Sequence, residues 1–246
     1  MKFFQQLFGI KYNHLYEILA TTIRYDALKE EFIPNTSVMG IRVVNKNIIK
    51  ITPYPTTQTY KNLKDNRFAT INLVNNIYLY ALAALKEPDS PIGLIEFPKE
   101  KYDYLKISNI ENLAKNFPKN IIDTIKKVPY IKSASGILIC KAFNEKKKLK
   151  KDKLGETNLT EFQLKCIFHK KFKDSVKLFN RAENLALESI IMATRLKVAY
   201  EKQDQELCSE LYNQILNYKT DAARFSENEN ANEAMKLVDY YVERYI

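Results

Sequence analysis

The sequence predicts an α+β protein in which an antiparallel β-barrel is followed by a helical region. Between residues 16 and 169, short apolar segments alternate with polar residues, as in half-buried strands. From Asn180 onward the apolar period becomes helical. A hydrophobic content of 46% with 12% aromatic residues is typical of a globular chain. We therefore predict a barrel domain at 1–176 and a helical subdomain at 177–246 that packs on it.

The predicted strands share alternating or β-branched apolar residues and are bounded by turn residues. They are 16–25, 32–44, 48–52, 68–74, 136–144 and 161–169. The polar residues Thr70 and Asn72 fall on one face of their strand, because strand side chains alternate. The last two segments predict a long hairpin joined by a lysine-rich tip at 146–153. Short strands at this spacing favour an antiparallel barrel.

Besides a short helix at 60–65, four helices are predicted from apolar periodicity and capping residues. Asn76 is positioned to cap a helix at 77–86, and Asp204 a helix at 205–225. Residues 181–202 carry a broad apolar face without a helix breaker, and a last helix follows residues 230–232.

Cysteine and histidine usage argues against several functional classes. Cys140, Cys166 and Cys208 are scattered, which disfavours a disulfide framework and a zinc ribbon. Cys166 falls on the apolar face of its strand, where we predict a buried core thiol. With only His14 and His169 available, neither a catalytic triad nor a histidine-rich metal site is expected. We predict no metal.

Charge and hydropathy suggest the partners and the compartment. The 39 Lys and Arg against 29 Asp and Glu give a net charge of +10, which suits an anionic partner. The lysine run could follow a nucleic-acid backbone, but lysines at turns are more often solvated, and no RNA-binding signature surrounds them. Nucleic-acid binding is therefore a minor alternative. No signal peptide or membrane-length apolar run is seen, so we predict a cytoplasmic protein without a membrane partner.

A threonine-rich junction, "TPYPTTQTYKNL" at 52–63, follows the third predicted strand. Prolines end that strand, and Thr56, Thr57 and Thr59 then lie at or just before the first turn of a predicted helix at 60–65. Unsatisfied N–H groups, a positive dipole end and hydroxyl donors together suit an anion. The alternative is that these threonines only cap the helix. No glycine-rich dinucleotide or P-loop motif is present.

A second polar segment, "NTSVMG" at 35–40, interrupts an otherwise apolar strand. A glycine within a strand, here Gly40, often marks a bulge or a close approach of the backbone to a ligand. Backbone groups there could meet the polar edge of a flat heterocycle, and Asn72 could face the same pocket. The alternatives are a simple bulge and an ordinary edge-strand asparagine.

Five segments together resemble a known family. They are "YEILATT", "NTSVMGIR", "TTQTYKNL", "FATINLVNN" and "FNRAENLALESIIMATRL". In this order they resemble an uncharacterised, mainly archaeal family of FMN-binding split-barrel proteins, over roughly residues 10–246. The first half is also similar to the wider flavin-reductase-like split barrels.

The resemblance implies a six-stranded antiparallel split barrel, a homodimer and bound FMN at or near the subunit interface. Carried over residue by residue, it implies a cofactor-binding set of nine residues. Thr57, Thr59, Tyr60 and Asn62 would hold the phosphate and ribityl chain, Ser37, Val38, Met39 and Gly40 would line the isoalloxazine edge, and Asn72 would lie nearby.

Two positions depart from the family pattern. Val38 stands where a proline often precedes the Met-Gly pair, and Pro55-Thr56 stands where a Lys-Gly pair is common. The second departure removes one candidate phosphate charge, so either the FMN affinity is weaker or Arg42 or Lys61 supplies the charge instead. The implied function is an FMN-dependent oxidoreductase of unknown substrate and electron donor, or alternatively a non-catalytic flavin carrier or sensor. No catalytic residue is predicted.

Overall fold

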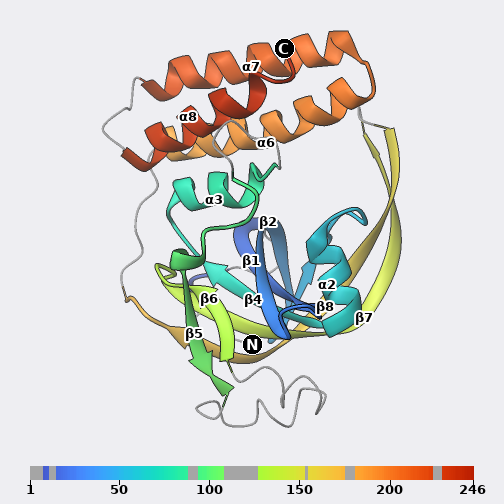
Figure 1. Ribbon diagram of the computed structural model, residues 1–246, viewed down its shortest axis with the longest axis vertical. Helices are drawn as coiled ribbons and strands as arrows, with labels where there is room; N and C mark the ends of the chain where they lie inside the picture. Colours follow the sequence, from blue (N-terminus) through green and yellow to red (C-terminus); the bar gives the residue numbers. More distant parts are fainter. Residues whose placement is uncertain are drawn as a thin grey trace. The chain divides into compact units, whose positions relative to one another are not determined.

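The computed structural model describes residues 8–10, 15–87, 94–107, 127–152, 155–174, 181–223 and 229–246. The chain forms two compact units (Figure 1). The first comprises residues 1–74, 98–150 and 156–175, and the second comprises residues 75–97, 151–155 and 176–246. Packing of the helices on the barrel stays a prediction. His14 and Lys153 lie outside the described residues.

In the first unit, six described strands close a barrel in the order β1-β2-β3-β8-β7-β4 (Figure 1). They are β1 (Leu15–Asp26), β2 (Glu31–Asn45), β3 (Ile48–Ile51), β4 (Phe68–Leu73), β7 (Gly136–Asp152) and β8 (Gly155–Lys171). Alternate side chains such as Ile41, Ile71 and Phe162 fill an apolar interior. The predicted α+β class and antiparallel barrel are confirmed.

Strand β3 closes the barrel by pairing with β8. Ile48 lies opposite Lys165, and Ile51 lies opposite Phe162. Glu161, almost fully buried, accepts hydrogen bonds from Lys148 and from Lys50, the latter at 2.9 Å. Burial raises the pKa of this carboxyl, but the two ammonium groups outweigh burial and hold the pKa below its ordinary value.

The lysine-rich stretch is extended strand, so the prediction of a hairpin tip at 146–153 is wrong. β7 continues through Asp152, and β8 begins at Gly155. The ammonium groups of neighbouring lysines repel one another. Lys148 bonds to Glu161 and Lys150 bonds to Tyr54, and these contacts stabilise the extended strand.

A two-stranded sheet of β5 (Tyr102–Lys106) and β6 (Lys127–Ile131) lies against the barrel's outer surface and was not predicted. Val128 packs with Ile23, Phe68 and Ile139 of the barrel strands. Two buried hydrogen bonds join the sheet to the barrel: Ile131 N–H donates to Asn72 at 2.8 Å, and the Tyr102 and Thr36 hydroxyls lie 2.7 Å apart.

The second unit contains α3 (Ile77–Ala84), α6 (Arg181–Glu201), α7 (Gln205–Ala223) and α8 (Glu229–Val242). Both predicted caps are confirmed, because Asn76 accepts from Tyr78 N–H at 3.0 Å and Asp204 from Leu207 N–H at 3.0 Å. The predicted apolar positions of the last helix, Val238 among them, are buried. Among the described helices, none has both the length and the apolar character needed to cross a membrane.

Candidate functional site

The threonine-rich junction leads into helix α2 (Gln58–Asn66), and Thr57 is its N-cap. The Thr57 hydroxyl donates to the Tyr54 carbonyl at 2.7 Å and accepts from Tyr60 N–H at 3.3 Å. The capping interpretation of Thr57 is therefore confirmed. The first turn contains no acidic residue, and the leading N–H groups of Gln58 and Thr59 have no intrahelical partner by the geometry of a helix start. The cap thus leaves a donor-rich helix end.

The two predicted segments meet through a contact between Thr59 and Ser37. The Thr59 hydroxyl donates to Ser37 Oγ at 2.9 Å and accepts from Asn35 Nδ2 at 3.2 Å. Thr59 is fully buried, whereas Ser37 is partly exposed. Sequence reasoning missed Asn35, although it lies in the segment that had been singled out.

The other two predicted α2 residues differ in accessibility. Asn62 is buried, donates to the Thr22 hydroxyl at 2.9 Å and accepts from Gln58 Nε2 at 2.7 Å. Tyr60 is partly exposed, and its ring lies edge-on to Phe162 at 5.9 Å. Asn62 therefore holds α2 against β1, while Tyr60 keeps an accessible surface.

Residues 37–40 of β2 lie at an edge that is open on one side. β1 pairs with this stretch in regular register through Gly40, so the alternative of a simple bulge is not seen in that pairing. β3 pairs with β2 only from Arg42 to Asn45, and no other described strand flanks residues 37–41. All four residues from Ser37 to Gly40 are partly exposed. At such an edge, alternate residues turn both N–H and C=O outward.

Asn72 does not join this group. Its side chain is fully buried, and its Nδ2 donates to the Leu19 carbonyl at 2.9 Å and to the Thr21 hydroxyl at 3.0 Å. Its Oδ1 accepts from Ile131 N–H of the covering sheet. Both ends of the amide are therefore used to hold the protein together.

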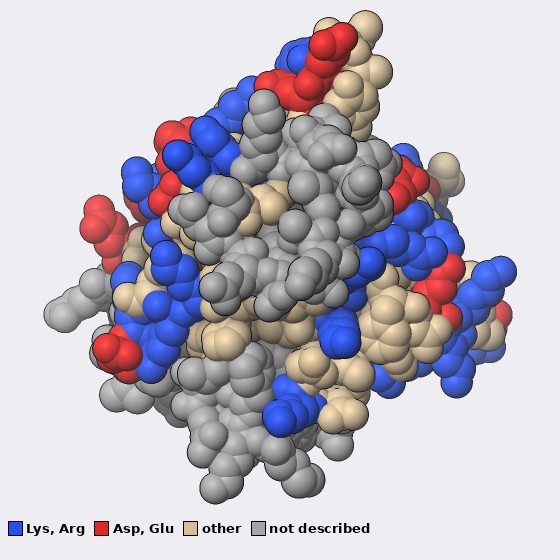
Figure 2. Space-filling view, turned by 90° about the horizontal axis from the view of Figure 1, so that it is seen from below, with Lys and Arg blue, Asp and Glu red and all other residues tan. Residues whose placement is uncertain are grey.

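Tyr54, which precedes α2 in the sequence, contacts a lysine that sequence reasoning had placed in a solvated turn. Lys150 of β7 donates to the Tyr54 hydroxyl at 2.5 Å and lies 5.2 Å from the centre of the Tyr54 ring. Arg42 and Lys61, the two predicted replacements, are exposed. On the face seen in Figure 2, basic side chains form separate patches with acidic side chains among them. That pattern adds no support for nucleic-acid binding.

Two of the cysteines and the described histidine pack against apolar side chains. Cys140 and Cys166 are buried in the barrel core, as predicted for Cys166. Burial raises the pKa of the Cys140 thiol, and burial lowers the pKa of His169, whose ring packs against Phe8. The described part of the chain contains no group of three His, Cys, Asp or Glu residues that could hold a metal ion.

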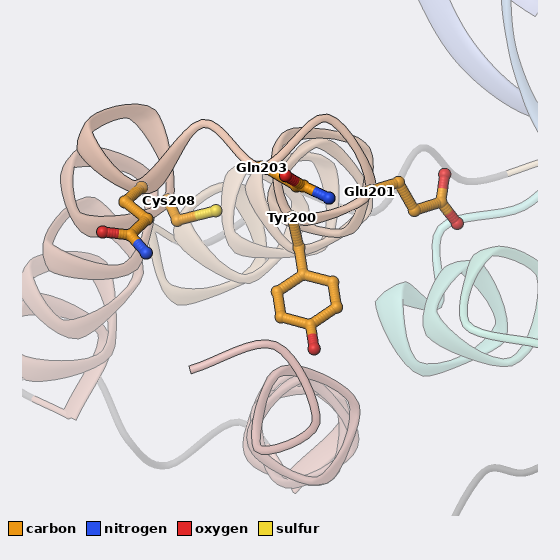
Figure 3. Close-up of a pocket in the computed structure, with 5 residues that line it drawn as sticks. Tyr200, Glu201, Gln203 and Cys208 are labelled. Carbon is orange, nitrogen blue, oxygen red and sulfur yellow. The ribbon is translucent and has the colours of Figure 1, made fainter.

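The helical unit carries a pocket of about 430 Å³ near the turn between α6 and α7 (Figure 3). It is lined by Tyr200, Glu201, Gln203, Gln205 and Cys208. In Figure 3 the Glu201 carboxylate points away from Cys208. Burial, together with Asp204, raises the pKa of the Cys208 thiol, so it stays protonated at neutral pH and is a weak nucleophile.

A polar cluster that no sequence pattern indicated joins three helices of the same unit. Glu87, after α3, accepts from Lys197 of α6 and from the Tyr241 hydroxyl of α8 at 3.3 Å. Burial raises the pKa of Tyr241, with Glu87 adding to the effect. Burial also lowers the pKa of Lys86 to about 8, against the opposing effect of Glu96. The cluster ties the helices to one another.

Residues 16–170 match the family described as "Protein of unknown function (DUF447) N-terminal domain". The chain belongs to the DUF447 family. The sequence-based family assignment is therefore confirmed. No curated relative matches the DUF447 chain.

Solved structures similar to this DUF447 protein include an FMN-bound protein from Methanosarcina mazei that is itself described as DUF447. The two are 17% identical, the match covers 95% of this chain and 97% of that one, and the TM-score is 0.62. A homologue of nitrilotriacetate monooxygenase component B from Mycobacterium thermoresistibile is 9% identical over 66% of this chain and 73% of that one, with a TM-score of 0.42. Flavoredoxin from Methanosarcina acetivorans is 10% identical over 68% and 74%, also with a TM-score of 0.42. The last two similarities are too weak to carry a structural conclusion.

Proposed function

We propose that this DUF447 protein binds FMN, with the phosphate at the start of α2 and the isoalloxazine ring along the open edge of β2. The observation that carries the proposal is the bond between Thr59 and Ser37, which joins a donor-rich helix start to an open strand edge. The FMN bound to the similar Methanosarcina mazei protein supports FMN as the ligand.

The α2 start fits a phosphate in chemistry. Backbone N–H groups and the positive end of the helix dipole favour an anion, and the Thr57 hydroxyl caps the helix that presents them. Thr59 and Asn62 are buried and bonded to the protein, so we assign them the task of orienting Ser37 and holding α2 in position. Tyr60, which is partly exposed, would flank the ribityl chain.

The edge of β2 fits a flat heterocycle. Outward backbone N–H and C=O groups between Ser37 and Gly40 match the polar rim of the ring, and the small Gly40 permits a close approach. Val38 and Met39 would give the ring apolar contact. We assign Asn72 to holding the covering sheet, not to flavin contact.

We propose an oxidoreductase role, with a flavin carrier or sensor as the alternative. When bound, FMN supplies the redox chemistry, while the protein controls access and the polarity around the ring. Anaerobic titration with reduced nicotinamide cofactors separates these roles, because an enzyme that uses them bleaches the flavin within its turnover time and a carrier does not. The cytoplasmic location stays a prediction.

The FMN proposal predicts a yellow protein or one that can be made yellow. We expect the purified chain, or the apoprotein after addition of FMN, to show flavin absorption bands that bleach on reduction. Equilibrium dialysis with FMN measures the stoichiometry. A folded protein that stays colourless and takes up no FMN would overturn the proposal.

We also propose that the protein is a homodimer. An open strand edge beside a flavin ring exposes backbone groups that a second subunit would cover. Sedimentation of the flavin-loaded protein at micromolar concentration is expected to give the mass of two chains. A flavin-loaded monomer at that concentration would contradict this expectation.

A further inference from the structure

We propose that Asn35 is a positioning residue that fixes the two halves of the FMN site relative to each other. The inference rests on the FMN site proposed above, in which the phosphate lies at the start of α2 and the ring lies along the edge of β2. Asn35 belongs to β2 and is partly exposed. It acts on the flavin through Thr59 and Ser37, and we assign it no contact with the flavin itself.

The side chain of Asn35 completes a three-way contact between β2 and the first turn of α2. Its Nδ2 donates to Thr59 Oγ1 at 3.2 Å and makes a longer contact with Ser37 Oγ at 3.5 Å. Thr59 in turn donates to Ser37 at 2.9 Å, so each of the three side chains contacts the other two. One hydrogen bond leaves rotation about its axis free, whereas a closed network makes its members rigid. Asn35 therefore sets the orientation of the α2 start against the β2 edge.

A second route joins Asn35 to α2, and it uses the backbone instead of the side chain. Asn35 lies opposite Thr22 of β1, and the Thr22 hydroxyl donates to the Asn35 carbonyl at 3.4 Å. The same hydroxyl accepts from Asn62 Nδ2 of α2 at 2.9 Å, and both Thr22 and Asn62 are buried. An alanine at position 35 keeps this carbonyl. We therefore expect α2 to stay attached to the barrel in such a variant, while its first turn loses one of its restraints.

The relative placement of the two halves matters only for a ligand that contacts both. FMN carries its ring and its phosphate on one ribityl chain, so the phosphate meets the α2 start only at the separation that this chain spans. A first turn that can shift against Ser37 must become ordered when FMN binds, and this ordering lowers the affinity. Riboflavin has the same ring and ribityl chain but no phosphate, so its binding does not depend on that alignment.

The test compares FMN with riboflavin by quenching of flavin fluorescence. We expect Asn35→Ala to weaken FMN binding about fivefold, as for the loss of one hydrogen bond, and to leave riboflavin binding within about twofold of the wild type. The matched control is Asn45→Ala, the same change at an exposed position of β2, which should alter neither affinity. Denaturant unfolding checks that Asn35→Ala is folded. If it is not, Asn35→Ser takes its place, because its hydroxyl can bond to water but ends one bond nearer the backbone.

A double-mutant cycle shows whether Asn35 acts through Thr59. In a Thr59→Val background the three-way contact is already broken, so we expect Asn35→Ala to change FMN affinity there by less than about twofold. Equal effects of Asn35→Ala in the two backgrounds would show that Asn35 acts by another route, and the positioning role would be wrong.

The remaining outcomes separate this inference from the proposed function. If Asn35→Ala leaves FMN affinity unchanged, lowers FMN and riboflavin affinity equally, or has no larger effect than Asn45→Ala, the positioning role is wrong while the FMN site stands. If the wild-type protein binds FMN no more tightly than riboflavin, the phosphate is not held at the α2 start, and this inference fails with that placement. If the wild type binds neither flavin, the proposed function itself fails.

Discussion

Replacement of Asn72 with leucine is expected to lower the free energy of unfolding by about 3–5 kcal/mol. Leucine has the same branching and number of side-chain non-hydrogen atoms but lacks the amide that bonds to the Leu19 carbonyl, the Thr21 hydroxyl and Ile131 N–H. All of these groups are buried. The Leu19 carbonyl and Ile131 N–H would lose this partner without gaining water, at about 1–3 kcal/mol each, while the Thr21 hydroxyl keeps its bond to Thr36. Denaturant unfolding of both proteins measures the difference.

The matched control for this variant is Asn217→Leu on the exposed side of α7. It makes the same chemical change away from any buried network, and its effect should stay within about 0.5 kcal/mol. A loss below about 1 kcal/mol for Asn72→Leu would mean that the covering sheet is not held by this amide.

The double variant Thr57→Val, Thr59→Val is expected to weaken FMN binding by about 1–3 kcal/mol, which is about 5- to 150-fold. Valine keeps the shape of threonine, but Thr57 loses its capping hydroxyl and Thr59 loses its bond to Ser37. The first change removes the cap that orders the phosphate end of α2, and the second removes the bond that orients Ser37 at the ring edge. Flavin fluorescence titration of the folded variant gives the affinity.

The control for the double variant is Thr56→Val, because Thr56 is exposed and neighbours the cap. Thr57→Ser, which retains a capping hydroxyl, should recover most of the phosphate contribution. If the folded double variant holds FMN as tightly as the wild type, the phosphate does not lie at the α2 start.

Local signals explain which parts of the fold could be predicted. The barrel strands alternate because one face meets the core, and Thr57 caps α2 because a side-chain oxygen satisfies a leading N–H group. Both rules act within a few residues. The covering strands β5 and β6 escaped prediction because β5 is short and largely exposed, which leaves little alternation to read.

Long-range contacts explain what the sequence could not reveal about the candidate site. Thr59 and Ser37 are each plausible polar residues alone, and their bond depends on α2 lying against β2. From the sequence, Asn72 could contact a ligand or bond within the protein, because a polar residue in a strand can do either. Its partner Ile131 decides between the two, and Ile131 belongs to the sheet that was not predicted. Lys150 was assigned to a solvated turn because lysine runs favour turns, whereas its strand continues beside α2.

The pairing of β3 with β8 also governs the order in which the chain can fold. β1 and β2 are joined by a tight turn, so they can pair as soon as both have been synthesised. β3, however, pairs with residues 162–165, and this segment of β8 is synthesised much later. Until then its outer edge is available to other chains, and such exposed edges promote aggregation. Barrel closure across so long a loop slows folding, so nascent chains cut short before β8 should be prone to self-association.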